Sequence, residues 1–582
     1  MSTELSEHLS RLVENAGEDS RRRWLRVGCW SVCIVLALLE TWSGRYYVDP
    51  DGISYLDMSD AFLRHNWHLL INSYWSPLYP FLIGLVTRVA KPSAYWELPL
   101  VHAVDFLIFI AALASFEFLL RQVIRNFGPR SDVQEAESCV RLPVWMWQLL
   151  GYGLFAWSTF VLISGIFMVT PDMLVVTFLY LDAGLLLQLH GGDRRLRVFL
   201  LLGLTLGLGY WAKAILFPMA FVFIATAFLV VRAWRKGILG LTATFLVFVA
   251  VSAPLIAGIS KSVGRPSFGE SGRLNYTWFV DGERRLPFYS HSPSPQIKHP
   301  LNRIHEHPNV FEFRQPFEVT YPLWFGLAYW NSGLRTRMNP KGQLRVIGES
   351  LVVLYYHLVE RMWGLIGGFC ILLFMSPNLR QRFKDILQSW PLVVPGVVGL
   401  CLYLLVGTML RYIGPFVVFV WLGLFSGIRL QKSRNSMKLG AITSLIITAS
   451  MMVLTVRMVA YHLGDPFPFL RGHGGMYYHL AESLRAEGLR PGDAVAIMGN
   501  EHDQMAWARA ARVRIIAQMS PDDVDEFWRT DAGVRQQVFD ALAAHGAKAV
   551  VTDQVPFCQG TAGWEGVGDT TYFVHFLVGS KS

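Results

Sequence analysis

Two aspartates stand where a carboxylate could act on a molecule at a membrane surface. Asp51 opens the segment Asp51–Pro80 after the first apolar run, and Asp172 follows Thr170 and Pro171 at the start of a later run. A partly desolvated carboxylate can take a proton from a hydroxyl group, so Asp51 is a candidate general base. Asp172 is a candidate for orienting the base or for binding a metal. Both also have a structural explanation, because Asp is favoured at helix N-caps and in first helical turns.

Two cations interrupt apolar sequence at what we expect to be the same membrane depth. Lys213 lies in GYWAKAILFP, and Arg411 lies in TMLRYIGPF directly before Tyr412. Lys and Arg bind phosphate oxygens well, and a lipid-linked phosphate is the natural anion at that depth. The alternative is that both side chains only snorkel to the lipid headgroups.

The segment around Asp51 has the pattern of an amphipathic helix. The apolar residues Ile53, Leu56, Leu63 and Trp67 follow helical spacing, and the other side carries Asp57, Asp60 and Arg64. This pattern predicts a helix lying on the membrane surface, with Asp57 and Asp60 solvated or structural.

The composition places these residues in a membrane protein. Of 582 residues, 53% are hydrophobic and only 16% are charged, whereas soluble domains carry roughly a quarter charged residues. The formal net charge of +9 does not indicate nucleic-acid binding, because the cations gather in short clusters between apolar runs.

A membrane-spanning helix needs about 20 apolar residues, which predicts about eleven spans. They are 24–42, 99–120, 142–163, 171–190, 196–211, 213–231, 238–258, 350–375, 391–409, 413–428 and 438–458. The apolar segment 77–90 is short and fits a re-entrant or interfacial helix better than a span.

The cations then predict the orientation. With residues 1–23 in the cytoplasm, every inside loop is basic, as the positive-inside tendency requires. These loops carry Arg121, Arg125, Arg130 and Arg141; Arg194, Arg195 and Arg197; Arg232, Arg235 and Lys236; Arg380, Arg382 and Lys384; and Arg429, Lys432, Arg434 and Lys438. The expected location is the cell (inner) membrane.

Three regions are expected on the outer side. Two are loops of the membrane domain 24–460, at 43–98 and 260–349. The third is the tail 461–582, where short apolar runs such as AVAIMG, VRIIAQM and AKAVVTD alternate with helical patterns. This alternation predicts a soluble, extracytoplasmic α/β domain.

Five short motifs, in this order, resemble the GT-C superfamily of polytopic glycosyltransferases. The resemblance is in particular to bacterial relatives of the dolichyl-phosphate-mannose protein mannosyltransferases and of the lipid A aminoarabinose transferases, which are family 39-like. The motifs are DGISYL at Asp51, WSPLYPFLIGL at Trp75–Leu85, TPDM at 170–173, GYWAKAILFP at Gly209–Pro218 and RYIGPF at Arg411–Phe416. The resemblance covers about residues 25–430.

The resemblance implies a GT-C-like fold and transfer of a sugar from a polyprenyl-phosphate-linked donor to a hydroxyl of a glycan, lipid or protein acceptor. Asp51 and Asp172 would be catalytic, and Lys213, Arg411 and Tyr412 would bind the donor phosphate. The aromatic residues that could contact sugar or acceptor are Tyr55, Tyr74, Trp75, Tyr321 and Trp324. The resemblance implies no particular cofactor and leaves open whether a divalent metal binds. Gly52 follows Asp51 where several relatives carry a second acidic residue, so the metal-binding pair of acidic residues is not present at this position.

Two other classes of protein remain as alternatives. A transporter or flippase of a lipid-linked or small polar substrate would show repeated halves and charged or broken helices at the midplane. The sequence shows no repeat, and its notable charges gather at one face. A sensor or assembly protein would use the tail to bind a partner.

Overall fold

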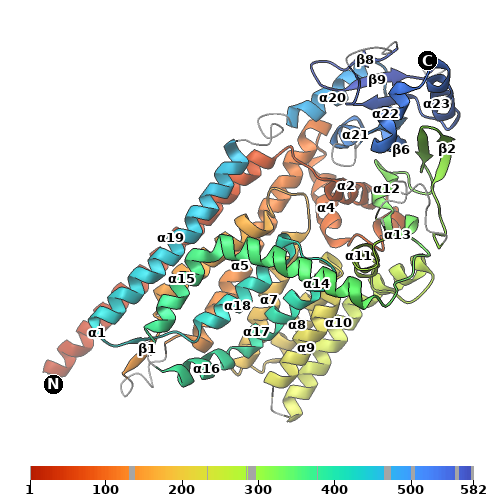
Figure 1. The fold of residues 1–582 in the computed structure, drawn as a ribbon. Coiled ribbons are helices and arrows are strands. Elements are labelled where there is room, and N and C mark those ends of the chain that lie inside the picture. Colours follow the sequence, from red (N-terminus) through yellow and green to blue (C-terminus); the bar gives the residue numbers. More distant parts are fainter. Residues whose placement is uncertain are drawn as a thin grey trace.

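The computed structural model describes residues 2–129, 138–231, 234–283, 285, 296–376, 378–464, 474–499, 505–556 and 563–577. It consists of an elongated helical bundle with a sheet-containing lobe at one end (Figure 1). We call this end the distal end, because it carries both the lobe and Asp51.

Within the described residues, seven helical stretches are long and apolar enough to cross a membrane. They are α1 (Ser2–Gly44, apolar from Ser20), α5 (Ala94–Phe127), α6 (Val144–Trp157) with η1 (Ser158–Ile163), α7 (Asp172–His190), α10 (Trp234–Val263), α14 (Pro340–Leu354) with η3 (Tyr355–Val359) and α15 (Glu360–Phe374), and α19 (Arg434–Gly464). Their burial differs with position: the spanning window of α7 is 83% buried, whereas that of α1 is 22% buried. Exposed apolar residues on α1 such as Trp24 and Leu38 are expected where a helix faces lipid.

The remaining apolar helices are shorter or bent. They are α4 (Leu78–Ala90), α8 (Leu196–Ala212), α9 (Leu216–Val230), α18 (Leu410–Phe425) and the pair α16 (Leu379–Gln388) and α17 (Trp390–Leu404), which is bent by 74°. Each predicted span therefore lies in an apolar helix, although the number that cross the membrane stays a prediction. The 13 residues of α4 reach only about 20 Å, and the assignment of this segment as a re-entrant or interfacial helix stays a prediction.

Three of the predicted inside loops meet at the other end of the bundle. The strands β1 (Cys139–Arg141) and β4 (Arg429–Gln431) pair in a short antiparallel ribbon. Arg141 and Arg429 both form ion pairs with Asp385 of α16. This places the three loops on one side, as their charges predict.

The distal lobe is built around a seven-stranded sheet in the order β2-β3-β6-β5-β7-β9-β8. Its strands are β2 (Asn302–Glu306), β3 (Asn309–Glu312), β5 (Ala494–Met498), β6 (Arg514–Met519), β7 (Ala549–Thr552), β8 (Glu565–Gly566) and β9 (Phe573–Phe576), and its helices are α20 (Gly474–Ala486), α21 (Ala506–Ala511), α22 (Pro521–Arg529) and α23 (Ala532–Ala544). The central strands β6, β5 and β7 are parallel, so the predicted α/β character is confirmed. The runs AVAIMG, VRIIAQM and AKAVVTD are these three strands.

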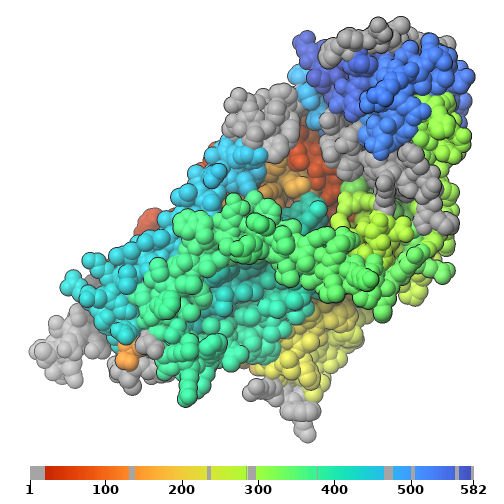
Figure 2. All heavy atoms as spheres, in the orientation of Figure 1, coloured from red at the N-terminus to blue at the C-terminus, as the bar shows by residue number. Residues whose placement is uncertain are grey.

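The sheet takes two strands from a distant part of the chain. The hairpin β2–β3 belongs to the loop 260–349, and β3 pairs antiparallel with β6 of the tail. Figure 2 shows the hairpin and the blue tail as one continuous lobe. The division of the chain into 24–460 and 461–582 stays a prediction, and the sheet crosses it.

Short helices connect the lobe to the bundle. They are α2 (Pro50–Leu63), α3 (Trp67–Leu70), α11 (Ser271–Phe279), α12 (Pro322–Phe325) and α13 (Leu327–Trp330). Helix α2 is not an exposed amphipathic helix, because both of its sides are covered. Ile53 and Leu56 are buried in the core, and Asp57 on the polar side is only 6% exposed. Its location at the level of the membrane surface stays a prediction.

Candidate functional site

The start of α2 fixes the position of Asp51. The Oδ1 atom of Asp49 accepts a hydrogen bond from the backbone N–H of Gly52 at 3.1 Å, and Pro50 occupies the first helical turn. Asp49 is therefore the N-cap, and the alternative that Asp51 caps this helix is wrong. Because Asp51 is not used for capping, its side chain is available for other contacts.

Gly52 is the tightest point of this turn. A Cβ atom at this position would lie 2.8 Å from Val169 Cβ and 2.8 Å from Val48 Cγ2. The site therefore has no space for a second acidic side chain directly after Asp51.

Asp51 is held by one cation and one indole. Arg411, in the first turn of α18, donates from Nη2 to Asp51 Oδ2 at 2.9 Å, and Trp324 of α12 donates from Nε1 to Oδ1 at 3.3 Å. The Arg411 and Asp51 side chains are 16% and 19% exposed. Both groups are thus shielded but can still be reached from a cavity.

Asp172 lies on the other side of Arg411. Lys213 Nζ donates to Asp172 Oδ1 at 2.5 Å, Thr170 donates to Oδ2 at 3.1 Å, and Arg411 Nε lies 3.7 Å from Oδ2. Lys213 reaches this point because the chain turns to extended backbone where α8 ends. Two carboxylates and two cations therefore form one neutral cluster with Arg411 at its centre.

Tyr412 completes the cation side of the cluster. Its hydroxyl accepts a hydrogen bond from Arg411 Nη2 at 3.0 Å, and Lys213 Nζ lies 3.9 Å from the centre of its ring. Cations over aromatic faces keep their charge at low desolvation cost. An incoming anion would therefore meet two preorganised cations and a phenol.

A cavity of about 460 Å³ opens on this cluster. Nine of the ten predicted site residues line it: Asp51, Tyr55, Tyr74, Trp75, Asp172, Lys213, Trp324, Arg411 and Tyr412. Its apolar wall includes Pro218 of α9, Val353 of α14 and Val406 after α17. The cavity thus joins a charged cluster to a surface that an acyl or isoprenoid chain can contact.

Tyr321 is the exception. It is 1% exposed, and its hydroxyl donates to Gln518 of β6 at 2.6 Å. Its predicted contact with sugar or acceptor is wrong, because the side chain points into the lobe and not into the cavity.

The sequence reasoning missed other lining residues. Arg285 lies over the rings of Trp278 and Trp324, at 5.2 and 5.6 Å, and Tyr403 stacks on Tyr412 at 5.3 Å. Arg285 has no carboxylate partner among the described residues. It sits in a polar loop with other cations, so no sequence signal distinguished it; Tyr403 could have been found as a polar tip near the end of an apolar run.

Burial controls the ionisation of two groups next to Asp51. Burial and then the charge of Asp51 raise the pKa of Asp49 to about 8, against the opposing effect of Arg411. Burial and the charge of Asp51 also raise the pKa of Tyr55 well above its ordinary value. The Tyr55 hydroxyl is therefore neutral and can serve as a hydrogen-bond donor.

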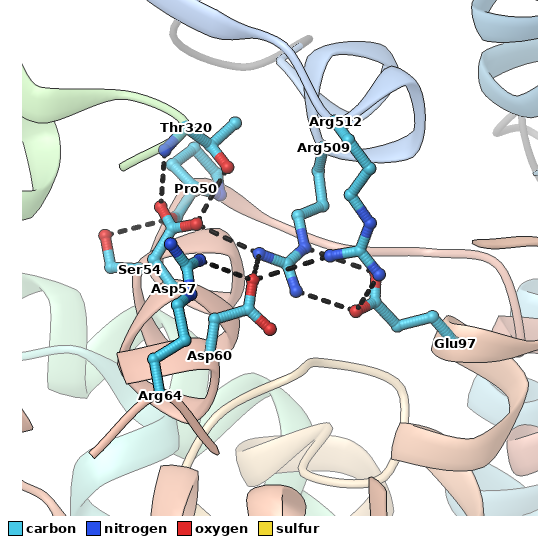
Figure 3. A network of polar contacts seen from close by, with 9 residues as sticks. All are labelled: Pro50, Ser54, Asp57, Asp60, Arg64, Glu97, Thr320, Arg509 and Arg512. Atoms are coloured by element: carbon cyan, nitrogen blue, oxygen red, sulfur yellow. Dashed lines mark hydrogen bonds and ion pairs between the residues drawn. The ribbon is translucent and has the colours of Figure 1, made fainter. Parts of the chain in front are cut away.

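The other end of α2 is fixed by the lobe (Figure 3). Arg509 of α21 donates to Asp57 at 3.0 Å, to Asp60 at 2.7 Å and to Glu97 of α5 at 2.7 Å. Thr320 donates to both oxygens of Asp57, at 3.0 and 2.8 Å. Burial raises the pKa of Asp57 to about 6 although Arg509 opposes it.

Over the described ranges, no group of three or more His, Cys, Asp or Glu side chains is arranged to hold a metal ion. Both Asp51 oxygens accept hydrogen bonds from Trp324 and Arg411.

No protein-family model matches the chain, and no curated protein matches it significantly. Among solved structures, the chain is similar to ArnT from Cupriavidus metallidurans bound to undecaprenyl phosphate, with 12% identity and a TM-score of 0.52, covering 95% of this chain and 99% of that one. Two structures of the Archaeoglobus fulgidus oligosaccharyltransferase, one tethered with an acceptor peptide and one with Zn and sulfate, match at 12% identity and TM-scores of 0.45 and 0.48, covering 90% of this chain and 68% of theirs. The similarity to ArnT shows that this multi-pass membrane protein has a GT-C-like fold, which confirms the predicted fold class.

Proposed function

We propose that this GT-C-like protein is a membrane glycosyltransferase that moves a sugar from a polyprenyl-phosphate-linked donor to an acceptor hydroxyl on the outer face of the membrane. The observation that carries the proposal is the convergence of Asp51, Asp172, Lys213 and Arg411 on one cavity with an apolar wall. ArnT, whose fold this chain shares, was crystallised with undecaprenyl phosphate, which supports a donor of the same class.

The reaction would be a single displacement with inversion at the anomeric carbon. Asp51 takes the proton of the acceptor hydroxyl, and the acceptor oxygen forms a bond to the anomeric carbon. The bond from that carbon to the phosphate oxygen breaks, and its electron pair stays on the phosphate. No covalent enzyme intermediate is required.

The cations would stabilise the departing phosphate. Lys213 and Arg411 already lie within 4 Å of a carboxylate, so they are oriented before the substrate arrives. Such fixed charges act strongly in a water-excluded site, where they need no reorganisation during the reaction. Asp172 is the positioning partner, since it holds Lys213 and Arg411 from the side opposite to Asp51.

The proposal includes an orientation of the protein in the membrane. Residues 1–23 would lie in the cytoplasm, and the lobe and the cavity would lie outside the inner membrane. The β1–β4 ribbon and its basic neighbours, at the end opposite to the cavity, support this orientation under the positive-inside tendency.

Asp51→Asn tests the proposal. The gene is deleted and then complemented with the wild type, with Asp51→Asn or with Asp193→Asn, and the glycan, lipid and protein fractions of the membrane are compared by mass. We expect one sugar increment with the wild type, and at least about a hundredfold less with Asp51→Asn because a general base typically contributes 10² to 10⁴ in rate.

Asp193→Asn is the matched control, because Asp193 follows α7 at the end opposite to Asp172. Its product should equal that of the wild type. Normal product from correctly folded Asp51→Asn protein would remove the base assignment. No mass increment from the wild type in any fraction would remove the proposed function.

A further inference from the structure

A second and larger cavity lies beside the candidate active site. Its volume is about 1080 Å³, and it is enclosed by α3, the end of α10 and three stretches of the loop 260–349. None of the predicted site residues lines it, and the proposed reaction does not use it. Figure 1 places α10, α11 and α13, which border it, beside one another at the distal end.

The two cavities are lined by neighbouring residues of the same segments. In three separate segments, one residue lines the second cavity and its chain neighbour lines the first: Ser73 and Tyr74, Glu270 and Ser271, and Phe325 and Trp324. A ligand of the second cavity therefore lies directly behind the aromatic residues that face Asp51.

Hydrogen bonds join these three segments into one wall. The Glu270 N–H donates to the Ser73 carbonyl at 2.7 Å, and Asn72 Nδ2 donates to the Phe325 carbonyl at 3.0 Å. Asn72 Oδ1 also accepts from the backbone N–H of Tyr74 at 2.8 Å. These contacts hold the three segments in place between the two cavities.

The second cavity is strongly positive. Four cations line it, namely Arg265, Arg273, Lys298 and Arg335, and Glu270 is the one carboxylate among its described lining residues. Glu270 is shared, because Arg265 donates to it at 2.7 Å and Arg273 at 2.6 Å. The side chains of Lys298 and Arg335 have no carboxylate partner in the described part of the chain.

The remaining lining suits a saccharide. His299 and Tyr329 stack at 4.0 Å with an angle of 6° between their rings, and Phe317 meets Tyr329 edge to face. Gln296, Asn72 and Ser332 add amides and a hydroxyl. Flat aromatic surfaces, amides and excess cations together match a ligand with hydroxyls, apolar ring faces and negative charge.

Hydrogen bonds from two backbone N–H groups fix the loop segments that carry Lys298 and Arg335. The Lys298 N–H donates to the Ser332 carbonyl at 2.8 Å, and the Arg335 N–H donates to Gln296 Oε1 at 3.2 Å. Lys298 and Arg335 are therefore held beside the same cavity, although their side chains are exposed.

We propose that the second cavity binds an anionic saccharide, with Lys298 and Arg335 as the residues that recognise its charge. Building on the proposed function, this saccharide is the non-reacting part of the acceptor, and the reacting hydroxyl extends past the Ser73–Tyr74 wall toward Asp51. The acceptor is then an acidic glycan.

Binding without donor tests the site. The full-length protein in phosphatidylcholine nanodiscs is titrated with trigalacturonate and with uncharged maltotriose at low salt. We expect the acidic trimer to bind at least about tenfold more tightly than maltotriose. The Lys298→Ala/Arg335→Ala variant should lose at least about tenfold in affinity for the acidic trimer, because charge-assisted contacts to carboxylates are the strong ones.

The control is Arg337→Ala/Lys341→Ala, which removes two exposed cations of the same loop that do not line the cavity. Its affinity should equal that of the wild type. Equal binding of the two trisaccharides, or equal loss in both double variants, would overturn the proposal.

These experiments test the saccharide site and the proposed transferase function independently. Charge-dependent binding without any sugar transfer would leave the site standing and remove the transferase assignment. Sugar transfer with an unchanged KM for the acceptor in Lys298→Ala/Arg335→Ala would remove the acceptor role and leave the transferase assignment standing.

Discussion

Three aspartates, Asp49, Asp51 and Asp172, lie near the guanidinium group of Arg411, and they differ in their contacts. Asp51 and Asp172 contact Arg411 directly, whereas Asp49 caps α2 and has no cation in contact among the described residues. Burial therefore dominates at Asp49 and raises its pKa to about 8. The Asp49 carboxyl therefore carries a proton at neutral pH.

This protonation predicts a pH dependence of stability. The folded pKa of Asp49 lies above the unfolded value of 3.8, so its contribution is complete below pH 3.8 and is lost as the pH rises to about 8. The loss amounts to at most about 1.4 kcal/mol per pH unit. Asn also caps helices but does not titrate, so Asp49→Asn should lose less thermal stability than the wild type between pH 5 and pH 8.

Thermal unfolding of both proteins in the same detergent, followed by intrinsic fluorescence, measures this difference. Parallel melting temperatures across that pH range would show that Asp49 is ionised in the folded protein.

Helix α2 connects the candidate active site to the ion-pair network between the bundle and the lobe. Its first turn carries Asp51 into the cavity, and its last turns carry Asp57 and Asp60 into the ion-pair network with the lobe (Figure 3). A shift of the lobe would therefore move the candidate base.

Arg509→Ala should destabilise the protein strongly. The substitution leaves Asp57, Asp60 and Glu97 buried without their shared cation, and breaking a buried ion pair costs about 3 to 5 kcal/mol. Arg512→Ala is the matched comparison, because Arg512 reaches Asp60 and Glu97 but is 34% exposed and does not contact Asp57. Its cost should be about 1 kcal/mol.

Thermal unfolding and sugar transfer are measured for both variants. Equal melting temperatures for the Arg509 and Arg512 variants would show that the network does not hold α2.

The same helix shows why sequence reasoning reached some elements and not others. Membrane helices follow from local apolar runs, and Asp51, Asp172, Lys213 and Arg411 attract notice because each lies at the edge of such a run or interrupts it. The polar side of α2 is predicted as solvated or structural, and the sequence does not decide between the two because the partner, Arg509, lies 452 positions from Asp57. Tyr321 was misassigned for the same reason, since Gln518 is 197 positions away.

At the scale of the whole molecule, the loop 260–349 and the tail share one sheet. The register pairs Glu312 of β3 with Ala517 of β6. Directly paired residues of antiparallel strands have Cα atoms about 4.5 to 5.5 Å apart, which is within the range of a disulfide.

Cysteines at this pair should therefore cross-link. We expect Glu312→Cys/Ala517→Cys to form a disulfide under mild oxidation, detected as a linked peptide pair by mass spectrometry. Glu306→Cys/Ala517→Cys is the control, because Glu306 pairs with Asn309 of the neighbouring strand and not with β6. Equal cross-linking in both variants, or none in the first, would contradict the shared sheet.

Because β3 pairs with β6, the sheet of a newly synthesised chain cannot be completed until the tail has been translated. Glu312 and Arg514 are 202 positions apart, and at roughly 5 to 20 residues per second the ribosome needs about 10 to 40 s to make that stretch. Throughout that interval the edge of β3 lacks β6 and the acidic end of α2 lacks Arg509. A nascent chain therefore exposes the edge of β3, which can pair with other chains and aggregate, until β6 has been synthesised and delivered to the same side of the membrane.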